Sequence, residues 1–274
     1  MASQQPDRGD TRVALAGDWH GNIGWALLML RVLRKRGVRT IYHLGDFGIW
    51  PTQDGDQFVR KVERDAALFG IDIWVTPGNH EDWDRIDALT GAAGEAPAQL
   101  TEHIHLLPRG YRWTHAGRTF VSVGGAPSVD YEKRSVGVEV YGKVRGRTWW
   151  PNEMITPEVA KSVAAAGHAE ILLSHDIPNL YVAAIQQIIV TNRYGWSNAA
   201  QNYAAQGRLA LDTVWEGVRP RLIAHGHYHV RADTVLDGDA GRVLSVDQEG
   251  KPGNLVLLDL SAEDFGVEWL LTYS

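Results

Sequence analysis

The chain of 274 residues is long enough to bury a substantial core, and it fits one large α/β domain better than two small ones. Hydrophobic residues make up 44% of it and charged residues 22%, which argues against a disordered or fibrous protein. The net charge of -6 argues against a protein whose main task is to coat nucleic acid, and the absence of cysteine excludes disulfides and thiolate metal ligands. The polar start, MASQQPDRGD, and the lack of a long apolar stretch predict a cytoplasmic protein without membrane contact.

The first hundred residues alternate strands, polar loops and helices three times. Strands are expected at RVALA, RTIYHL and IDIWV, and each runs into a polar loop, GDWHGN, GDFG or TPGNHE. The first helix is expected to stop at Gly37, and the second to cover residues 56–69 and stop at Gly70. A third is expected over EDWDRIDAL, with Glu81 supporting its first turn. This alternation predicts a parallel sheet whose polar loops meet at one edge, where ligands usually bind.

After Leu100 the pattern changes to short strands joined by tight turns. HIHLL, YRWTH and RTFVSVGG predict the start of a second sheet, with a hairpin turn at HAGR. A capped helix at TPEVAKSVAAAGH, a strand ending in SHDIP, a helix over residues 199–215, a strand ending in HGHYH and antiparallel strands follow. Two segments, about 128–151 and 179–198, resemble inserted loops. The sequence therefore predicts a single domain over residues 1–274 with two insertions.

Five of the expected strands end in side chains that bind metals: Asp18 and His20, Asp46, Asn79 with His80, His175, and His227 with His229. Taken singly, each is an ordinary turn, helix-cap or structural residue. Together they indicate a metal site, because most follow an apolar strand and adjoin glycine, which lets the backbone approach a small ligand. Carboxylate, imidazole and amide donors suit a divalent ion such as manganese, iron or zinc. There are more donors than one ion needs, so we expect two ions about 3.5–4 Å apart, bridged by Asp46.

The same five blocks resemble the calcineurin-like metallophosphoesterases, whose pattern is D-x-H, GD, GNH followed by D or E, a lone H, and GHxH. The chain has DWH, GD, GNHE, SHD and GHYH in that order. The resemblance implies a four-layer α/β/β/α sandwich with two mixed sheets and a dinuclear metal site at the strand ends. It implies a first metal held by Asp18, His20, Asp46 and His229, and a second held by Asp46, Asn79, His175 and His227. His225 does not match the pattern and is expected to pack or to support a ligand.

The resemblance also implies a hydrolase that uses two divalent metal ions, with Mn²⁺ expected first and Fe, Zn or Ni as alternatives. A hydroxide that bridges the two ions would attack the phosphate ester in line, with Asp46 and His80 as the catalytic residues. His80 would give the leaving oxygen a proton. Asn79 and His80 would both contact the substrate.

The motifs favour a phosphodiester as the substrate, such as a cyclic nucleotide or another nucleotide diester. Protein phosphatases and dinucleoside tetraphosphate hydrolases of this superfamily extend GD to GDxxDRG or a close relative, and the phosphatases place an arginine before GNHE. The chain has GDFGIWP and TPGNHE instead, so it lacks the arginines that would clamp a monoester phosphate. A phosphomonoesterase or protein phosphatase and a nuclease of the same superfamily are the alternatives.

The first insertion combines basic and aromatic side chains that suit a nucleotide or single-stranded nucleic acid: Tyr131, Lys133, Arg134, Lys143, Arg145, Arg147, Trp149 and Trp150. Arg145 and Trp149 are the residues from this set that we expect to contact substrate. A solvated loop anchored by its tryptophans explains the same composition. A non-catalytic protein-interaction scaffold is the alternative of another class. Such scaffolds typically lose a ligand or the acid histidine, whereas here every matched position is filled. Oligomeric state is left open by the sequence.

Overall fold

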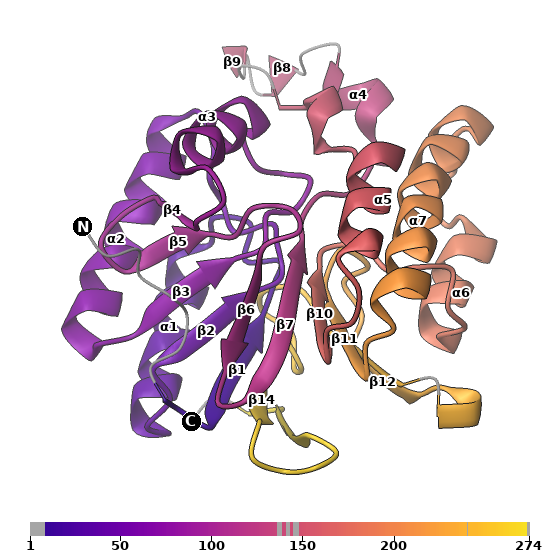
Figure 1. Cartoon of the computed structure of the whole chain (residues 1–274). Helices are drawn as coiled ribbons and strands as arrows, with labels where there is room; N and C mark the ends of the chain where they lie inside the picture. Colours follow the sequence, from indigo (N-terminus) through magenta and orange to yellow (C-terminus); the bar gives the residue numbers. More distant parts are fainter. Residues whose placement is uncertain (1–8, 136–138, 141–142, 145–147, 240, 273–274) are drawn as a thin grey trace.

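Two β-sheets lie face to face, and helices cover the outer side of each sheet (Figure 1). The structure is a computed structural model and describes residues 9–135, 139–140, 143–144, 148–239 and 241–272. One cluster of buried apolar side chains lies between the sheets, and two others lie between a sheet and its helices. The expected four-layer α/β/β/α arrangement with two mixed sheets is therefore confirmed.

Seven strands of the described chain form the first sheet, in the order β15 (Gly266–Leu270), β14 (Leu255–Asp259), β1 (Arg12–Ala16), β2 (Thr40–His43), β3 (Asp72–Val75), β5 (Ile104–Leu106) and β4 (Ala98–Gln99). Strands β1, β2, β3 and β5 are parallel, whereas β14, β15 and β4 are antiparallel to their neighbours. β2 and β3 are buried at every position, as the apolar character of their sequences requires for parallel strands covered on both faces.

The second sheet has six strands among the described residues, in the order β12 (Ala232–Val235), β13 (Arg242–Ser245), β11 (Leu222–His225), β10 (Ile171–Ser174), β7 (Arg118–Val123) and β6 (Arg112–His115). Strands β7, β10, β11 and β13 are parallel, and the two outer strands are antiparallel. The hairpin predicted at HAGR joins β6 to β7, with Ala116 and Gly117 both at positive φ.

Three helices cover the first sheet: α1 (Ile23–Lys35), α2 (Gln53–Phe69) and α3 (Trp83–Ala93). The second sheet is covered by α5 (Pro157–Ala165), α6 (Ala183–Thr191) and α7 (Asn198–Val218). Helix α2 begins earlier than predicted, at Gln53, because the Thr52 side chain accepts a hydrogen bond from Gly55 N and caps the first turn. It ends where predicted, at Gly70, whose φ of 65° closes the helix in the left-handed conformation.

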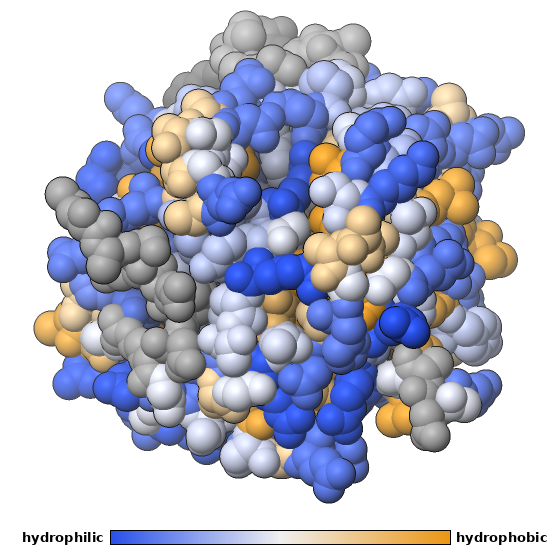
Figure 2. Space-filling view, viewed as in Figure 1, coloured by the Kyte–Doolittle hydropathy of each residue, from blue (hydrophilic) through white to orange (hydrophobic). Residues whose placement is uncertain are grey.

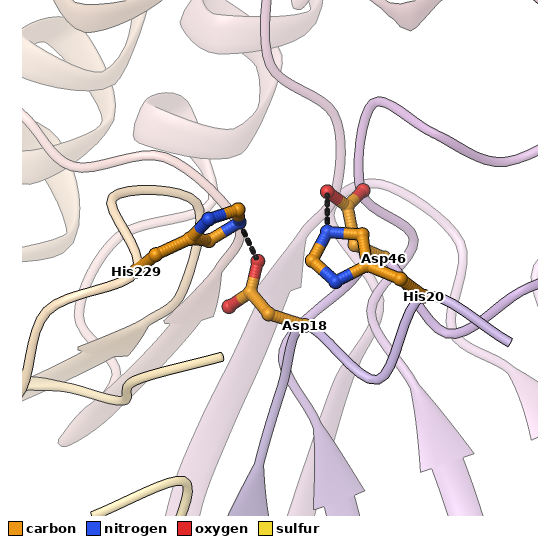
Figure 3. A group of neighbouring side chains, drawn as sticks. All are labelled: Asp18, His20, Asp46 and His229. Carbon is orange, nitrogen blue, oxygen red and sulfur yellow. Dashed lines mark ion pairs between the residues drawn. The ribbon is translucent and has the colours of Figure 1, made fainter. Parts of the chain in front are cut away.

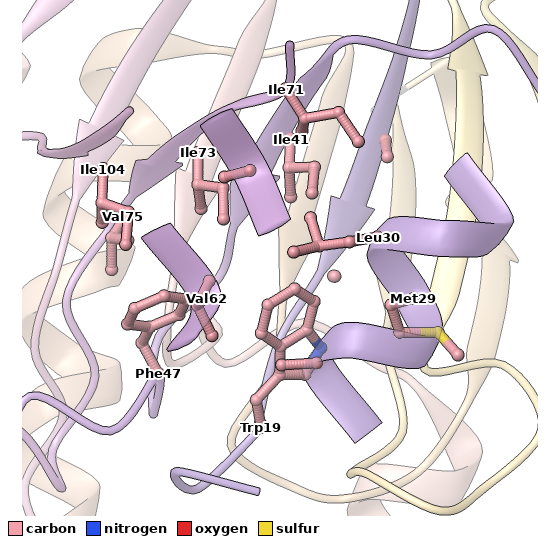
Figure 4. Close-up of a cluster of buried hydrophobic side chains, with 14 of the residues drawn as sticks. Trp19, Met29, Leu30, Ile41, Phe47, Val62, Ile71, Ile73, Val75 and Ile104 are labelled. Atoms are coloured by element: carbon pink, nitrogen blue, oxygen red, sulfur yellow. The ribbon is translucent and has the colours of Figure 1, made fainter. Parts of the chain in front are cut away.

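Two aromatic residues anchor the first two polar loops in the core between the first sheet and its helices. Trp19 and Phe47 are both fully buried and pack with Met29, Ile41 and other apolar side chains (Figure 4). Each directly follows a predicted metal ligand in the chain. Burial of the aromatic ring therefore fixes the position of the polar side chain that precedes it.

One predicted boundary between the sheets was wrong. HIHLL forms β5, which pairs in parallel with β3 and belongs to the first sheet, and the second sheet starts only at β6. Helix α3 returns the chain to the edge of the first sheet, so a fourth strand follows the βαβ pattern of the first three. Periodicity alone could not assign so short an apolar run to one sheet or the other.

The two segments expected to be inserted loops contain regular structure. The first includes α4 (Tyr131–Ser135), the paired strands β8 (Glu139–Val140) and β9 (Lys143–Val144), and leads into a 3-10 helix, η1 (Pro151–Glu153). The second contains α6, whose sequence AAIQQIIVT has few polar positions, so its helical periodicity is weak. A further 3-10 turn, η2 (Asp237–Asp239), precedes β13.

In the described part of the chain, no helix is both long enough and apolar enough to span a membrane. The face shown in Figure 2 is mostly hydrophilic, with apolar side chains gathered in small groups.

Candidate metal centre

The polar loops after five parallel strands meet at one edge of the two sheets. Within the first sheet, Asp18 N donates to Gly45 O at 2.9 Å, which joins the first two loops. Within the second, Gly226 N donates to His175 O at 3.2 Å. The sheets are joined where His227 N donates to the Asp18 carboxylate at 3.1 Å. Side chains far apart in the sequence therefore converge on one small region between these loops, here called the recess.

The structure brings the four residues predicted for the first metal together. Each of Asp18, His20, Asp46 and His229 offers a nitrogen or oxygen atom, and these atoms all lie within 4.8 Å of one another (Figure 3). His20 Nε2 lies 3.4 Å from Asp46 Oδ2, and His229 Nε2 lies 3.4 Å from Asp18 Oδ1. Both carboxylates are buried, whereas the His229 side chain is 38% exposed, so this group opens to solvent on one side.

The four residues predicted for the second metal also converge, with Asp46 shared between the two groups. Asp46 Oδ1 lies 3.3 Å from His175 Nε2. Asn79 Oδ1 lies 2.9 Å from His175 Nε2 and 3.1 Å from His227 Nδ1. One oxygen of Asp46 therefore faces His20 while the other faces His175, as a bridging carboxylate requires.

Backbone strain is concentrated at these residues. Nine non-glycine residues of the described chain have positive φ, and five of them are predicted ligands: Asp18, His20, Asp46, His227 and His229. Such conformations cost of order 1–3 kcal/mol each and persist at sites where function requires them. The ends of β1, β2 and β11 thus turn these side chains toward the recess at a cost in local energy.

Glycine makes the close approach of the loops feasible. A Cβ atom at Gly226 would lie 2.2 Å from Asp18 Oδ2, and one at Gly78 would lie 2.2 Å from Asp46 Oδ1. Any side chain at either position would displace a predicted ligand.

The protonation states of the cluster show how strongly it attracts positive charge. Burial alone raises the pKa of Asp46, but the charge of His175 and hydrogen bonds from His175 and His20 hold it well below its ordinary value. Burial lowers the pKa of His20, but its bonds to Asp46 and Glu249 outweigh this effect and raise it to about 11. The pKa of His175 is raised to about 10, because Asp46 and Asp18 outweigh its burial. The two buried carboxylates thus favour positive charge in their surroundings, as a site for divalent cations requires.

Supporting residues orient the imidazoles. His175 Nδ1 lies 2.7 Å from Leu44 O, so it donates there and leaves Nε2 facing the recess. His20 Nδ1 lies 2.9 Å from Glu249 Oε2 in the same kind of arrangement. Burial and the charge of His175 lower the pKa of His227 to about 3, so its imidazole is neutral and can act as a ligand. Glu249 lies 229 positions from His20 along the chain, and no local pattern in the sequence marks it as a partner.

The sequence suggested that Glu81 supports the first turn of α3, but in the structure it does not. Asp82 caps that helix by accepting from Arg85 N, and Glu81 lies fully buried beneath the loops. Its carboxylate accepts backbone hydrogen bonds from Asp46, Gly48 and Gly78. Burial and the charge of Asp46 raise the pKa of Glu81 to about 7. Glu81 thus joins the second polar loop to the third.

His80 lies at the mouth of the recess rather than among the closest donors. Its Nε2 is 3.9 Å from Asp46 Oδ2, its backbone N donates to Asp46 Oδ1 at 2.9 Å, and its side chain is 36% exposed. Desolvation lowers the pKa of His80 to about 4, and the charges of Arg134 and His20 act in the same direction.

The substrate contacts predicted in the first insertion have separate outcomes. Arg145 lies outside the described residues. Trp149 donates through Nε1 to Glu153 Oε1 at 3.0 Å, and its ring packs beside Tyr131 and Tyr203, so it anchors the insertion. His225 is fully buried and its Nδ1 lies 2.9 Å from Gly226 O, which fits the expectation that it packs beneath the ligands.

The residues present fit a pair of divalent cations. Two carboxylates, four imidazoles and one amide oxygen are the donors that such ions take in the absence of thiolates. The shared position of Asp46, the strained backbone and the glycine contacts all hold these donors around one recess.

Comparison with known proteins is consistent with this geometry. The family profile described as calcineurin-like phosphoesterase matches residues 11–231. No curated protein sequence matches the chain significantly. Among solved structures, a dimetal phosphatase from Danio rerio superposes with a TM-score of 0.56 at 12% identity, over 96% of this chain and 99% of that one. A protein from Thermus thermophilus superposes with a TM-score of 0.55 at 14% identity, over 94% and 98%. At these identities the likeness shows the fold alone.

Proposed function

Because the chain belongs to the calcineurin-like phosphoesterase family, whose members hydrolyse phosphate esters, we propose that it is a metal-dependent phosphodiesterase acting on a nucleotide diester. The observation that carries the metal-dependent chemistry is the position of Asp46, whose two oxygens face two separate groups of donors. We further propose that residues 1–274 act as one domain, because both sheets contribute ligands to the same recess.

The first cation would be held by Asp18, His20, Asp46 and His229, and the second by Asp46, Asn79, His175 and His227. Mn²⁺ is the proposed ion, because oxygen and nitrogen donors are mixed and no sulfur donor is present. When bound, the two cations lower the pKa of water and neutralise the phosphate oxygens.

His80 is the proposed proton donor to the leaving oxygen. Its imidazole lies beside Asp46 at the open side of the recess, where a phosphate ester held against both groups of donors would come within reach. The pKa of His80 is about 4 without substrate, and negative charge developing on a leaving oxygen raises it, since an anion favours imidazolium. Asn79, next to His80 in the chain, would contact the same phosphate.

The contacts of Arg134, the arginine that reaches the GNHE segment, support the proposed preference for a diester. Arg134 donates to Ser128 Oγ and to the carbonyl oxygens of Asn79 and Thr148. Its guanidinium is thus committed to the protein and does not offer the paired donors that a dianionic monoester requires. A diester carries one negative charge fewer and needs no such clamp.

The test compares a diester with a monoester, and then two diesters that differ in their leaving group. Protein loaded with Mn²⁺ should hydrolyse bis-p-nitrophenyl phosphate faster than p-nitrophenyl phosphate. His80→Ala should lower the rate on a 2′,3′-cyclic nucleotide by about 10²–10⁴-fold, because its alkoxide leaving group needs a proton, and much less on bis-p-nitrophenyl phosphate. His168→Ala, a change at an exposed histidine bonded to Val218 O, is the matched control and should leave both rates unchanged.

Each part of the proposal has an outcome that would contradict it. Faster turnover of the monoester would contradict the diester preference. An equal loss on both diesters in His80→Ala would contradict proton donation. Absence of turnover with any divalent metal would favour a non-catalytic scaffold.

A nuclease of the same family is the second candidate. Cation–aromatic pairs lie on the inserted segments, with Lys133 Nζ 4.4 Å from the centre of the Trp196 ring and the Arg193 guanidinium 4.7 Å from that of Tyr194. Such pairs suit stacked bases and a phosphate backbone. Cleavage of a single-stranded oligonucleotide at a higher kcat/KM than any mononucleotide diester would favour this candidate.

A further inference from the structure

Asn79 is the one proposed ligand with an amide side chain, and the orientation of that amide matters. Its amide has an oxygen that can bind a cation and a nitrogen of nearly the same shape that cannot. The oxygen faces His175 and His227, and the nitrogen, Nδ2, donates to Ser128 Oγ at 2.9 Å. If Ser128 Oγ accepts a hydrogen bond from Asn79, the amide nitrogen faces Ser128 and the oxygen faces the second cation. If Ser128 Oγ donates to Asn79 instead, the amide is reversed.

The other hydrogen bonds of Ser128 allow only one orientation of the Asn79 amide. A serine hydroxyl has two acceptor lone pairs and one proton. Arg134 Nη1 lies 2.6 Å from Oγ and can only donate, so it occupies one lone pair. Ser128 Oγ donates its proton to Glu153 Oε2 at 2.9 Å. Only one lone pair remains, so the Asn79 amide must present its nitrogen to Ser128 and its oxygen to the recess.

This group is buried and is supplied by the first insertion. Ser128 and Glu153 are fully buried, Arg134 is 8% exposed and Asn79 is 3% exposed. Glu153 Oε1 accepts from Ser128 N at 2.6 Å and from Trp149 Nε1 at 3.0 Å, which fixes the carboxylate from its other side. Water has little room to replace these partners, so a lost bond is not readily recovered.

The same insertion also holds the backbone of the ligand. Arg134 Nη2 donates to Asn79 O at 3.2 Å while Nη1 donates to Ser128 Oγ. Arg109 supports the far end of the network by donating through Nη2 to the carbonyl oxygen of Glu153 at 2.9 Å.

We infer that Ser128, Glu153 and Arg134, here called the Asn79 clamp, are positioning residues that set the affinity of the second cation by fixing the Asn79 amide. The inference rests on the proposed function only in taking Asn79 as a ligand. It explains why the insertion reaches beneath the recess as well as around it, and it assigns a role to residues outside the five motif blocks. Partners of this kind typically change metal affinity by about 10–100-fold.

The charge of Glu153 is consistent with this arrangement once a cation is bound. Burial raises the pKa of Glu153 to about 8, against the opposing effect of Arg134 and of the bonds from Ser128 and Trp149. A cation held by Asn79 lowers that pKa, because nearby positive charge favours the carboxylate. The carboxylate then accepts the Ser128 proton, as the geometry shows.

The test is a titration of metal-free protein with Mn²⁺. Calorimetry and electron paramagnetic resonance are used to monitor the binding. Ser128→Ala removes the hydroxyl but keeps the backbone N–H, and it should weaken the second site by about 10–100-fold while leaving the first unchanged. The spectrum should then show isolated Mn²⁺ in place of a coupled pair at intermediate concentrations. Ser122→Ala is the matched control, since Ser122 is also fully buried and its Oγ lies 2.9 Å from Thr76 Oγ1.

Two further variants separate orientation from packing. Glu153→Gln keeps the side-chain shape, but its amide nitrogen would donate to Ser128, whose proton would then turn to the Asn79 oxygen. We expect Glu153→Gln to weaken Mn²⁺ binding at the second site as Ser128→Ala does. If Ser128→Ala does not fold, Glu153→Gln is used in its place. In an Asn79→Asp background, where both oxygens can bind a cation, Ser128→Ala should have a much smaller effect.

Equal Mn²⁺ affinities for Ser128→Ala, Ser122→Ala and the unaltered protein would overturn the inference, as would an undiminished effect in the Asn79→Asp background. These readouts do not depend on turnover. If the protein binds two ions as described but hydrolyses no phosphate ester, the proposed function fails and the clamp stands. If it hydrolyses diesters while Ser128→Ala binds Mn²⁺ normally, the clamp fails and the function stands.

Discussion

Substitution of Gly226 by alanine tests the close packing on which the metal centre depends. The new Cβ atom would lie 2.2 Å from Asp18 Oδ2, whereas real Cβ atoms essentially never come within 3.0 Å of a neighbour. The carboxylate or the loop after β11 must therefore move by at least about 0.8 Å, and both are held, because His227 N donates to Asp18 at 3.1 Å. Ligand distances tolerate only about 0.2 Å, so we expect the first cation to bind at least 10²-fold more weakly. Overpacking should also lower the free energy of unfolding by about 1–3 kcal/mol.

The assay is the Mn²⁺ content of the protein after gel filtration, together with urea denaturation in the presence of chelator. Gly91→Ala is the matched control, because Gly91 lies within α3 and its added Cβ would meet no other atom of the described residues within 4 Å, apart from its chain neighbours and the adjoining helix backbone. Alanine in a helix should raise the free energy of unfolding by roughly 0.5–1 kcal/mol and leave metal content unchanged. If Gly226→Ala retains two ions at unchanged affinity and the normal denaturation midpoint, the close approach inferred at Asp18 is wrong.

Three other predictions address the core beneath the site and the effects of Mn²⁺ binding. Both ring nitrogens of His43 are buried with no hydrogen-bond partner among the described residues, and its ring packs against Trp19 and Phe47, so His43→Leu should raise the free energy of unfolding by about 1 kcal/mol in urea denaturation. A loss of stability would show that the imidazole has a polar partner. At pH 8, Mn²⁺ binding should release at least two protons, because the pKa values of His20 and His175 are about 11 and about 10 and a ligand imidazole must be neutral. Binding heats that are identical in buffers of different ionisation enthalpy would contradict this. Free Mn²⁺ at 100 times the Kd of a site should stabilise the protein by about 2.7 kcal/mol for each site over the chelated form, and an unchanged melting temperature would argue against a site that forms only on folding.

The sequence predicted the parts of the fold and the site that depend on local pattern. Apolar runs placed most strands, and the residues immediately after them placed the polar loops, because a strand that ends at a sheet edge exposes its next side chains there. Asp18, His20 and Asp46 could be proposed in this way from two short motifs. The assignment of β5 to the wrong sheet marks the limit, since a three-residue strand does not determine its own neighbour.

The supporting residues could not be predicted, because each acts through a contact between distant segments. Glu81 lies inside a motif, yet its role as acceptor for three loop N–H groups depends on the loop after β2 closing over it. Glu249 lies beyond the residues matched by the family profile, and only the fold brings it to His20. Composition favoured a nucleotide-facing role for the first insertion, whereas its buried side chains turn toward Asn79 and Glu153.

The position of the first insertion has a consequence for how substrate preference can change in this fold. Its outer side is joined to the second insertion, because Ser197 Oγ donates to Glu132 at 2.9 Å and Lys133 lies over the Trp196 ring. Its inner side holds the Asn79 amide through Ser128. A change on the outer side of the first insertion that suits another substrate therefore also affects Asn79, the proposed ligand of the second cation, unless the contact between Ser128 and Asn79 is kept. We expect variants of the first insertion to alter Mn²⁺ affinity and diester selectivity together.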